Sequence, residues 1–299
     1  MSCRPSWFAF AAFALLAMSI HDAAGQGRGV PGDFAFFSAR GGNNDIYVTN
    51  WDGREPLRIT DDPGSDVDPA ISPNGREVVF TSNRTGNNDI YVVDSVGGPA
   101  VNLTNNGAND GWARWSPNGK HIVFQSNRDG NFEIYIMDAD GQLPTRLTNY
   151  PGVDQYPDWS PDGRFIVFRR DTDIYVMELS SGEASRLTAA APLNQMPVWS
   201  PDGRQVAFMS TRDGYPSVFL MNADGSDQRN LTPKNVGDAD ADWVSRAPAW
   251  SVNGRHIFFM SSRPSTGLDT EIFVMNPDGS GVTRLTNSIG MDGSPRGRQ

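Results

Sequence analysis

The sequence predicts an all-β protein, a six-bladed β-propeller in which each blade is a four-stranded antiparallel sheet. Three observations lead to this prediction: one motif recurs along nearly the whole chain, each copy alternates as β-strands do, and turn residues separate the strands at fixed places. No segment of the sequence shows a sustained helical period.

Two landmarks define the recurring motif. A Leu-Thr pair (Ile-Thr in the first copy) closes each copy, with the threonines Thr60, Thr104, Thr148, Thr188, Thr232 and Thr286 spaced 44, 44, 40, 44 and 54 residues apart. A serine follows the opening strand of five copies, at Ser72, Ser116, Ser160, Ser200 and Ser251. Matched landmarks at regular intervals indicate a repeat architecture.

Each copy has room for four strands and the turns between them. The turn SPDGR at 160–164 uses proline to preset φ and glycine to take a positive φ. The second strand alternates, as in HIVFQS at 121–126, and the third is rich in β-branched and aromatic residues, as in DIYVVD at 89–94. A blade alone cannot bury both faces of its sheet, so the blades must stack around a ring. We therefore expect the residue before each recurring serine to fill the core between blades: Ile71, Trp115, Trp159, Trp199 and Trp250.

The first copy and the C-terminal tail complement each other. The first copy begins at Phe34 and lacks an opening strand, whereas the tail after Thr286 sets Asp292 opposite Asp154 and Pro295 opposite Pro157. We expect Ser294–Arg298 to supply the innermost strand of the first blade and to close the ring, which would protect two sheet edges. The alternative is a frayed tail.

The N-terminus is typical of a secretory signal. Arg4 precedes an apolar run of 14 residues from Trp7 to Ile20, shorter than the ~20 residues that a membrane-spanning helix needs. We predict a signal peptide at 1–25 and a propeller at 26–299, with an uncleaved anchor as the alternative. The protein is then periplasmic or secreted, with no transmembrane segment after cleavage. The single cysteine, Cys3, falls in the cleaved part, so no disulfide is expected.

The charge balance is acidic, with 35 Asp and Glu against 25 Lys and Arg and a net charge of -10. Nucleic acid is excluded as a partner because phosphate binding needs a basic face. The charge suits basic peptides, cations or plain solubility. We expect a monomer.

One position recurs three residues before the proline slot of the opening strand: Asp66, Asp110, Asp154, Asn194, Ser245 and Asp292. If the ring closes, these residues line one mouth of the central channel. Carboxylates facing one axis repel each other unless a cation such as Ca²⁺ or a basic peptide neutralises them, which predicts a partner or cation site at Asp66, Asp110, Asp154, Asn194 and Asp292. The metal candidates are the four aspartates. The alternative is that these side chains cap turns.

An arginine after the second strand recurs together with an acid before the third. We expect hairpin-stabilising ion pairs between Arg40 and Asp45, Arg84 and Asp89, Arg128 and Glu133, Arg170 and Asp173, and Arg263 and Glu271. Two irregular places also stand out. The fourth blade is shortened between its second and third strands, and an acidic loop at 233–248 holds Asp238, Asp240 and Asp242.

The copies of W-S-P-D-G-R, I-Y-V-M and R-L-T resemble the TolB-like, WD40-like (PD40) propeller repeat over about 260 residues. The resemblance implies a six-bladed propeller, a periplasmic location, cations held in the channel, and an envelope partner such as the peptidoglycan-associated lipoprotein. TolB proteins also have an N-terminal α/β domain. Here the blades begin near Phe34, so we expect the propeller without that domain.

The sequence favours binding over catalysis. His21 lies in the predicted signal, and His121 and His256 occupy the same slot of two different blades, so they make no metal pair. No G-x-S-x-G nucleophile motif is present. We predict a non-catalytic scaffold of the cell envelope that recognises a protein or peptide at the channel mouth. The alternative is a carbohydrate-active enzyme, a lyase or glycosidase, that uses the channel-mouth carboxylates.

Overall fold

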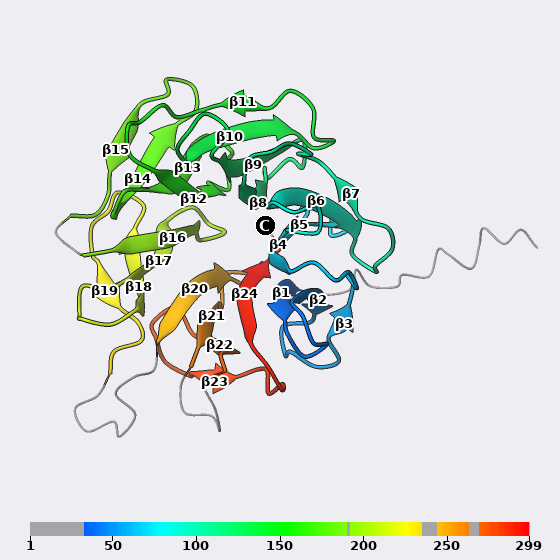
Figure 1. The fold of residues 1–299 in the computed structure, drawn as a ribbon. Coiled ribbons are helices and arrows are strands. Elements are labelled where there is room, and N and C mark those ends of the chain that lie inside the picture. The colour runs from blue at the N-terminus through cyan, green and yellow to red at the C-terminus, as the bar shows by residue number, and fades with distance from the viewer. Residues whose placement is uncertain (1–32, 190–191, 235–243, 263–268, 299) are drawn as a thin grey trace, which may run out of the picture. The chain divides into compact units, whose positions relative to one another are not determined.

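The computed structural model describes residues 33–189, 192–234, 244–262 and 269–298. In these residues the protein is all-β, without a helix, and forms six four-stranded sheets arranged around a channel (Figure 1). The predicted six-bladed propeller is confirmed. The predicted signal peptide at 1–25 and most of the acidic loop at 233–248 lie outside the described residues.

Each blade runs from an innermost strand beside the channel to an outermost strand at the rim. The innermost strands are β24 (Asp292–Gly297), β4 (Asp66–Ile71), β8 (Asp110–Trp115), β12 (Asp154–Trp159), β16 (Asn194–Trp199) and β20 (Ser245–Trp250) for blades one to six. The second strands are β1 (Phe34–Ser38), β5 (Glu77–Ser82), β9 (His121–Ser126), β13 (Phe165–Arg170), β17 (Gln205–Ser210) and β21 (Ile257–Ser261). The third strands are β2 (Asp45–Thr49), β6 (Asp89–Asp94), β10 (Glu133–Asp138), β14 (Asp173–Glu178), β18 (Ser217–Asn222) and β22 (Glu271–Met275). The outermost strands are β3 (Leu57–Arg58), β7 (Val101–Asn102), β11 (Thr145–Arg146), β15 (Ala184–Arg186), β19 (Arg229–Asn230) and β23 (Thr283–Arg284).

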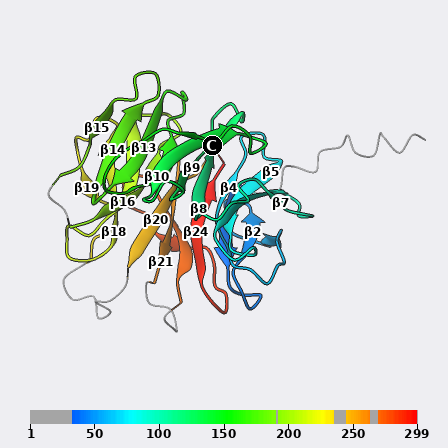
Figure 2. The same ribbon diagram turned by 45° about the horizontal axis from the view of Figure 1, so that its top comes forward.

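The C-terminal strand closes the ring. β24 pairs antiparallel with β1, with Phe34 opposite Gly297 and Ser38 opposite Asp292 (Figures 1 and 2). The first blade is thus built from both ends of the propeller, as the sequence predicts. Pairing with β24 covers the inner edge of β1, which removes a site for unwanted strand pairing.

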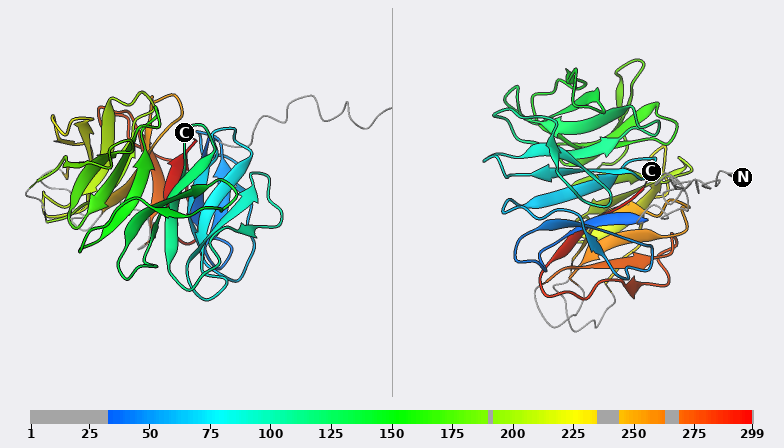
Figure 3. Two further views of the ribbon diagram at one scale, coloured as in Figure 1. Left: turned by 90° about the horizontal axis from the view of Figure 1, so that it is seen from above. Right: turned by 90° about the vertical axis from the view of Figure 1, so that its right-hand side faces the viewer.

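The blades pack face to face, as the side views show (Figure 3). The expected inter-blade slot is confirmed: Ile71, Trp115, Trp159, Trp199 and Trp250 are all buried. Trp115 donates its indole N–H to the Ala70 carbonyl of the preceding blade at 3.2 Å, and Trp159 donates to the Arg114 carbonyl at 3.3 Å. These two tryptophans therefore add both apolar area and a directed bond between neighbouring blades.

The recurring threonine has a definite structural task. Its hydroxyl oxygen accepts the backbone N–H of the second residue of the third strand, for example Ile134 to Thr148 and Ile174 to Thr188, both at 2.9 Å. The same hydroxyl donates to the acid that begins the third strand, as Thr148 does to Glu133 at 2.6 Å. The Leu-Thr motif thus ties the end of the outermost strand to the start of the third.

The propeller has two faces, which we name after these motifs. The threonine face holds the recurring threonines and the starts of the innermost strands. The turn face holds the ends of those strands and the Pro-Asp/Asn-Gly turns, such as the turn at 160–163, where Gly163 has a φ of 71°. Blade four is shortened on the threonine face, where only Asp171 and Thr172 join β13 to β14. Within the described residues, no helix could span a membrane.

Candidate functional site

The predicted site residues begin the innermost strands on the threonine face, as expected, but they are buried. Asp66, Asp154, Asn194, Ser245 and Asp292 are 0% exposed and Asp110 is 1% exposed. Each side chain turns into its own blade and has a partner there. This burial places the residues around one end of the channel without opening their side chains to it.

Arginines of the same blades bind these carboxylates. Arg84 donates to both oxygens of Asp66 at 2.9 Å, and Arg170 donates to the two oxygens of Asp154 at 2.9 and 2.7 Å. Arg128 reaches Asp110 at 3.1 Å, and Arg40 reaches Asp292 at 2.9 Å. Burial raises the pKa of Asp154, and the Arg170 guanidinium opposes that rise.

These contacts do not fit a shared cation. A calcium ion would need several carboxylate oxygens turned toward one point, whereas each aspartate here is already neutralised by its own guanidinium. Within the described part of the chain, no three His, Cys, Asp or Glu side chains are grouped so that they could hold a metal ion. Ca²⁺ at Asp66, Asp110, Asp154 and Asp292 remains a prediction without support from this geometry.

The predicted pairing of arginines with the acids of the third strands is wrong. The arginine after the second strand lies over aromatic rings, as Arg84 does at 4.6 Å from the Tyr91 centroid, and reaches inward to the innermost strand. The acid of the third strand instead receives an arginine from the outermost strand in four blades: Arg58 to Asp45, Arg146 to Glu133, Arg186 to Asp173 and Arg284 to Glu271. Arg263 lies outside the described residues. The prediction paired these residues because they flank one hairpin and are close in sequence. In the structure the arginine pairs with the innermost strand, and the acid pairs with the outermost strand.

The channel itself is lined by the middle of the innermost strands. Their third residues all have a positive φ, between 45° and 57°: Asp68, Trp112, Tyr156, Met196, Ala247 and Ser294. A left-handed residue at the same place in six strands makes a bulge, and the pairing register shifts there in every blade. Five of these residues, all except Asp68, line one narrow pocket in the middle of the channel.

One buried ion pair and a second buried acid and arginine occupy this channel, and the sequence analysis missed them. Arg296 donates to Asp158, whose other oxygen accepts the Trp199 backbone N–H at 2.8 Å. Asp68 accepts a bond from Ser294 at 2.9 Å and lies in the field of Arg114. Burial lowers the pKa of Arg114 to about 10 while Asp68 opposes that shift, and burial raises the pKa of Asp68.

A comparison of the repeats in the sequence could have identified these charged residues. The fifth residue of the innermost strand is Ala70, Val198 or Ala249 in three blades, but Arg114, Asp158 or Arg296 in the other three. A charged residue in a slot that neighbouring repeats fill with an apolar one marks a place where the repeat has been modified.

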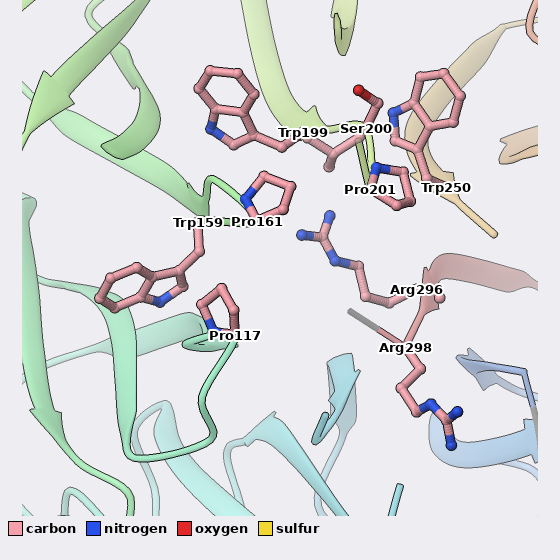
Figure 4. Close-up of a pocket in the computed structure, with 11 residues that line it drawn as sticks. Pro117, Trp159, Pro161, Trp199, Ser200, Pro201, Trp250, Arg296 and Arg298 are labelled. Atoms are coloured by element: carbon pink, nitrogen blue, oxygen red, sulfur yellow. The ribbon is translucent and has the colours of Figure 1, made fainter. Parts of the chain in front are cut away.

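A pocket opens at the centre of the turn face (Figure 4). Its walls are the indole rings of Trp159, Trp199 and Trp250 and the turn prolines Pro117, Pro161 and Pro201. Figure 4 shows Arg296 extending from β24 toward Pro161 and Pro201. The pocket is therefore apolar at its walls, with the guanidinium of Arg296, paired with Asp158, and with Arg298 also among its lining residues.

The histidines contribute nothing to this pocket. The Nδ1 atom of His121 lies 3.2 Å from the Oδ1 atom of Asp138 on the neighbouring strand. The His256 ring stacks on the Trp51 ring, with centroids 6.3 Å apart. They belong to blades three and six, as the sequence analysis placed them.

Two sequence families match the chain. The family described as the TolB beta propeller domain matches residues 31–126 and 110–173. The family described as the Tricorn protease N-terminal beta propeller domain matches residues 165–294. No curated protein matches the sequence.

Solved propellers share the fold. TolB from Acinetobacter baumannii is 24% identical with a TM-score of 0.75, and the match covers 90% of this chain and 68% of that one. A protein assigned as TolB from Agrobacterium tumefaciens is 26% identical with a TM-score of 0.67, covering 85% of this chain and 87% of that one. Oligogalacturonate lyase from Vibrio parahaemolyticus is 15% identical with a TM-score of 0.55, covering 86% and 74%. At 15% identity, the lyase likeness concerns the fold alone.

Proposed function

Because the chain is a TolB-like β-propeller, we propose that it is a non-catalytic binding or scaffold protein of the cell envelope. In this proposal it is periplasmic or secreted, and it recognises a protein or peptide partner at the centre of the propeller. The partner site is the pocket of the turn face rather than the ring of buried aspartates on the threonine face.

The observation that supports this proposal most is the chemistry of the turn-face pocket. Three indole rings and three prolines make a rigid apolar wall, and such side chains lose little conformational freedom when a partner binds. Tryptophans in partly enclosed pockets are typical anchors of protein interfaces. The pocket therefore suits an apolar or aromatic side chain presented by a polypeptide.

The geometry does not favour the carbohydrate-active enzyme. A glycosidase needs two carboxyl groups about 5–10 Å apart that both reach the sugar. The carboxylates at the threonine face are buried against arginines, and Asp158 on the turn side is buried against Arg296. Neither group is placed as an acid and a base beside an open cleft.

Capture of a partner from envelope extract, with and without chelator, tests the proposal. Pro201→Glu puts a charge at the rim of the pocket, and Pro73→Glu makes the same change in the equivalent turn of blade two, outside the pocket. Val252 occupies this slot in blade six, so the turn tolerates residues other than proline. We expect Pro201→Glu to weaken capture by about tenfold, because an apolar partner would have to desolvate the new carboxylate, and Pro73→Glu to leave it unchanged.

Equal capture by both variants would place the partner elsewhere. Turnover of a polysaccharide by the wild-type protein, with no partner captured, would contradict a binding role. Capture that occurs without chelator and is lost when chelator is added would support the predicted binding of Ca²⁺.

A further inference from the structure

Among the described residues of the threonine face, some arginines form no ion pair with an acid, and Arg169 is one of them. Arg169, on β13, donates to the amide oxygens of Gln155 at 2.5 Å and Gln195 at 3.0 Å, and its guanidinium lies 5.2 Å from the centroid of the Tyr156 ring. Its Nε is buried and makes no hydrogen bond in the described structure. The next residue, Arg170, shows the contrast, because it is paired with Asp154.

In blades two and three the residue equivalent to Arg169 makes a bond to the next blade. Thr81 in blade two and Gln125 in blade three accept the backbone N–H of the bulge residue of the next blade, Trp112 at 3.3 Å and Tyr156 at 3.0 Å. A guanidinium has no acceptor and cannot make this bond. Phe37, Met209 and Met260 fill the slot in blades one, five and six without this bond, so the slot varies between blades, and in blade four it holds a cation.

Arg169 also fixes the two glutamines as donors. Because the amide oxygens of Gln155 and Gln195 accept hydrogen bonds from Arg169, the NH₂ groups of the two side chains are the groups available to a ligand. Neither NH₂ group donates a hydrogen bond to any other described residue. The two amides and the guanidinium together present several N–H donors, while the amide oxygens are turned toward Arg169.

Another arginine without an ion pair in the described part of the chain lies on the adjacent innermost strand. Arg246 is the second residue of β20, the register position that Gln195 holds on β16, and it is partly exposed. Across the described residues it forms no ion pair. The acid that begins the innermost strand in blades one to four is replaced here by Asn194 and Ser245, so blades five and six lack that negative charge. Within the described residues, the innermost strands of blades five and six therefore begin without a carboxylate.

From these contacts we propose that Gln155, Arg169, Gln195 and Arg246 form a second binding site, which takes a carboxylate. A guanidinium matches the two oxygens of a carboxylate in its plane, and charge-assisted bonds of this kind are among the strongest in proteins. The Tyr156 ring beneath Arg169 would support the body of the ligand. The carboxylate could belong to a uronic acid or to the C-terminus of a peptide. The site is on the face opposite the turn-face pocket and does not depend on the proposed partner.

Calorimetric titration at low salt tests this site with two probes. The first is galacturonate, with galactose as its neutral match, and the second is a short peptide with a free C-terminus, with its C-terminal amide as match. Arg169→Gln copies Gln125 of blade three, and Arg246→Gln copies Gln195 of blade five, so both variants use a residue that the repeat already accommodates there. Arg255→Gln, on the exposed turn of blade six, is the control.

We expect at least one acid probe to bind, its neutral match not to bind, and each arginine variant to weaken binding by about tenfold, with Arg255→Gln unchanged. The acid probe that binds identifies the source of the carboxylate. Binding of neither probe, equal binding by the arginine variants, or equal binding of inorganic phosphate would overturn the proposal. Partner capture by the double variant should stay at the wild-type level, so failure of this site and failure of the turn-face pocket can be told apart.

Discussion

The two faces of the propeller use the same six strands in different ways. On the threonine face, nearly every carboxylate is bound inside its own blade, to arginines, threonines and backbone N–H groups. On the turn face, the same strands end in tryptophans and prolines that surround an open pocket. The comparison teaches that a charge repeated in blade after blade is structural here. On the threonine face, charged groups available for a ligand occur where a blade departs from the repeat.

The largest expected effect lies between the two faces, at the buried pair of Asp158 and Arg296. Asp158→Ala leaves a buried guanidinium without its carboxylate and the Trp199 N–H without its acceptor, so the free energy of unfolding should fall by about 3–5 kcal/mol. Urea denaturation measures this loss. Glu183→Ala, exposed in the same blade, should change stability by less than about 0.5 kcal/mol.

A variant that removes both charges of the Asp158–Arg296 pair tests the same ion pair further. Asp158→Ala combined with Arg296→Met should recover part of the lost stability, because no buried charge is left unpaired. A loss below about 1 kcal/mol for Asp158→Ala alone would show that the pair is not buried as described.

An intermediate effect is expected at Glu133, on the threonine face. Burial opposes its ionisation, but bonds from Thr148, the Tyr150 N–H, Arg146 and Asn131 hold its pKa below the ordinary 4.5. A carboxyl whose pKa is lowered by folding stabilises the protein above its unfolded pKa and loses that contribution as the pH falls through its folded pKa. Glu133→Gln should therefore cost about 2 kcal/mol at pH 7, and the gap from wild type should narrow below pH 4.5.

Denaturation curves at pH 7 and in the acid range check this expectation. A substitution on the turn face that removes no titrating group, such as Trp159→Phe, serves as the reference. A gap for Glu133→Gln that is the same at both pH values would mean that its ionised form makes no special contribution.

The smallest expected effect is a difference in stability between phenylalanine variants of two turn-face tryptophans. Trp159 donates its indole N–H to Arg114, whereas the buried indole nitrogen of Trp199 has no partner in the described residues. Trp159→Phe should be more destabilising than Trp199→Phe by about 1 kcal/mol, the net value of one hydrogen bond. Thermal unfolding of the two variants measures the difference, and equal losses would argue that the bond contributes nothing.

Much of the fold follows from the sequence because its determinants are local. Pro-Asp/Asn-Gly turns, alternating strands and the threonine spacing predict the blades. The tail with Asp292 and Pro295 predicts the closing strand, since it repeats the residues that open the other blades. The pairing of Arg84 with Asp66 instead of Asp89 was not predictable in this way. Arg84 follows β5, and the two acids lie on the strands on either side of β5. Only the twist and packing of the blade select one of them.

The candidate sites depend on contacts between blades, which a repeat pattern conceals. Asp158 and Arg296 are 138 residues apart and meet only when the ring closes. Arg169 joins Gln155 of its own blade to Gln195 of the next. An alignment of the copies shows that these residues are unusual for their slots, but it does not show which of them meet across the channel.

The central claim, that a polypeptide partner occupies the turn-face pocket, is tested most directly by NMR of the tryptophan indole N–H groups during titration with the captured partner. Substitution of each tryptophan by phenylalanine assigns the signals. The account predicts shifts for Trp159, Trp199 and Trp250, which line the pocket, and none for Trp51, exposed at the rim of blade one. Partner binding that leaves the three pocket signals unmoved would contradict it.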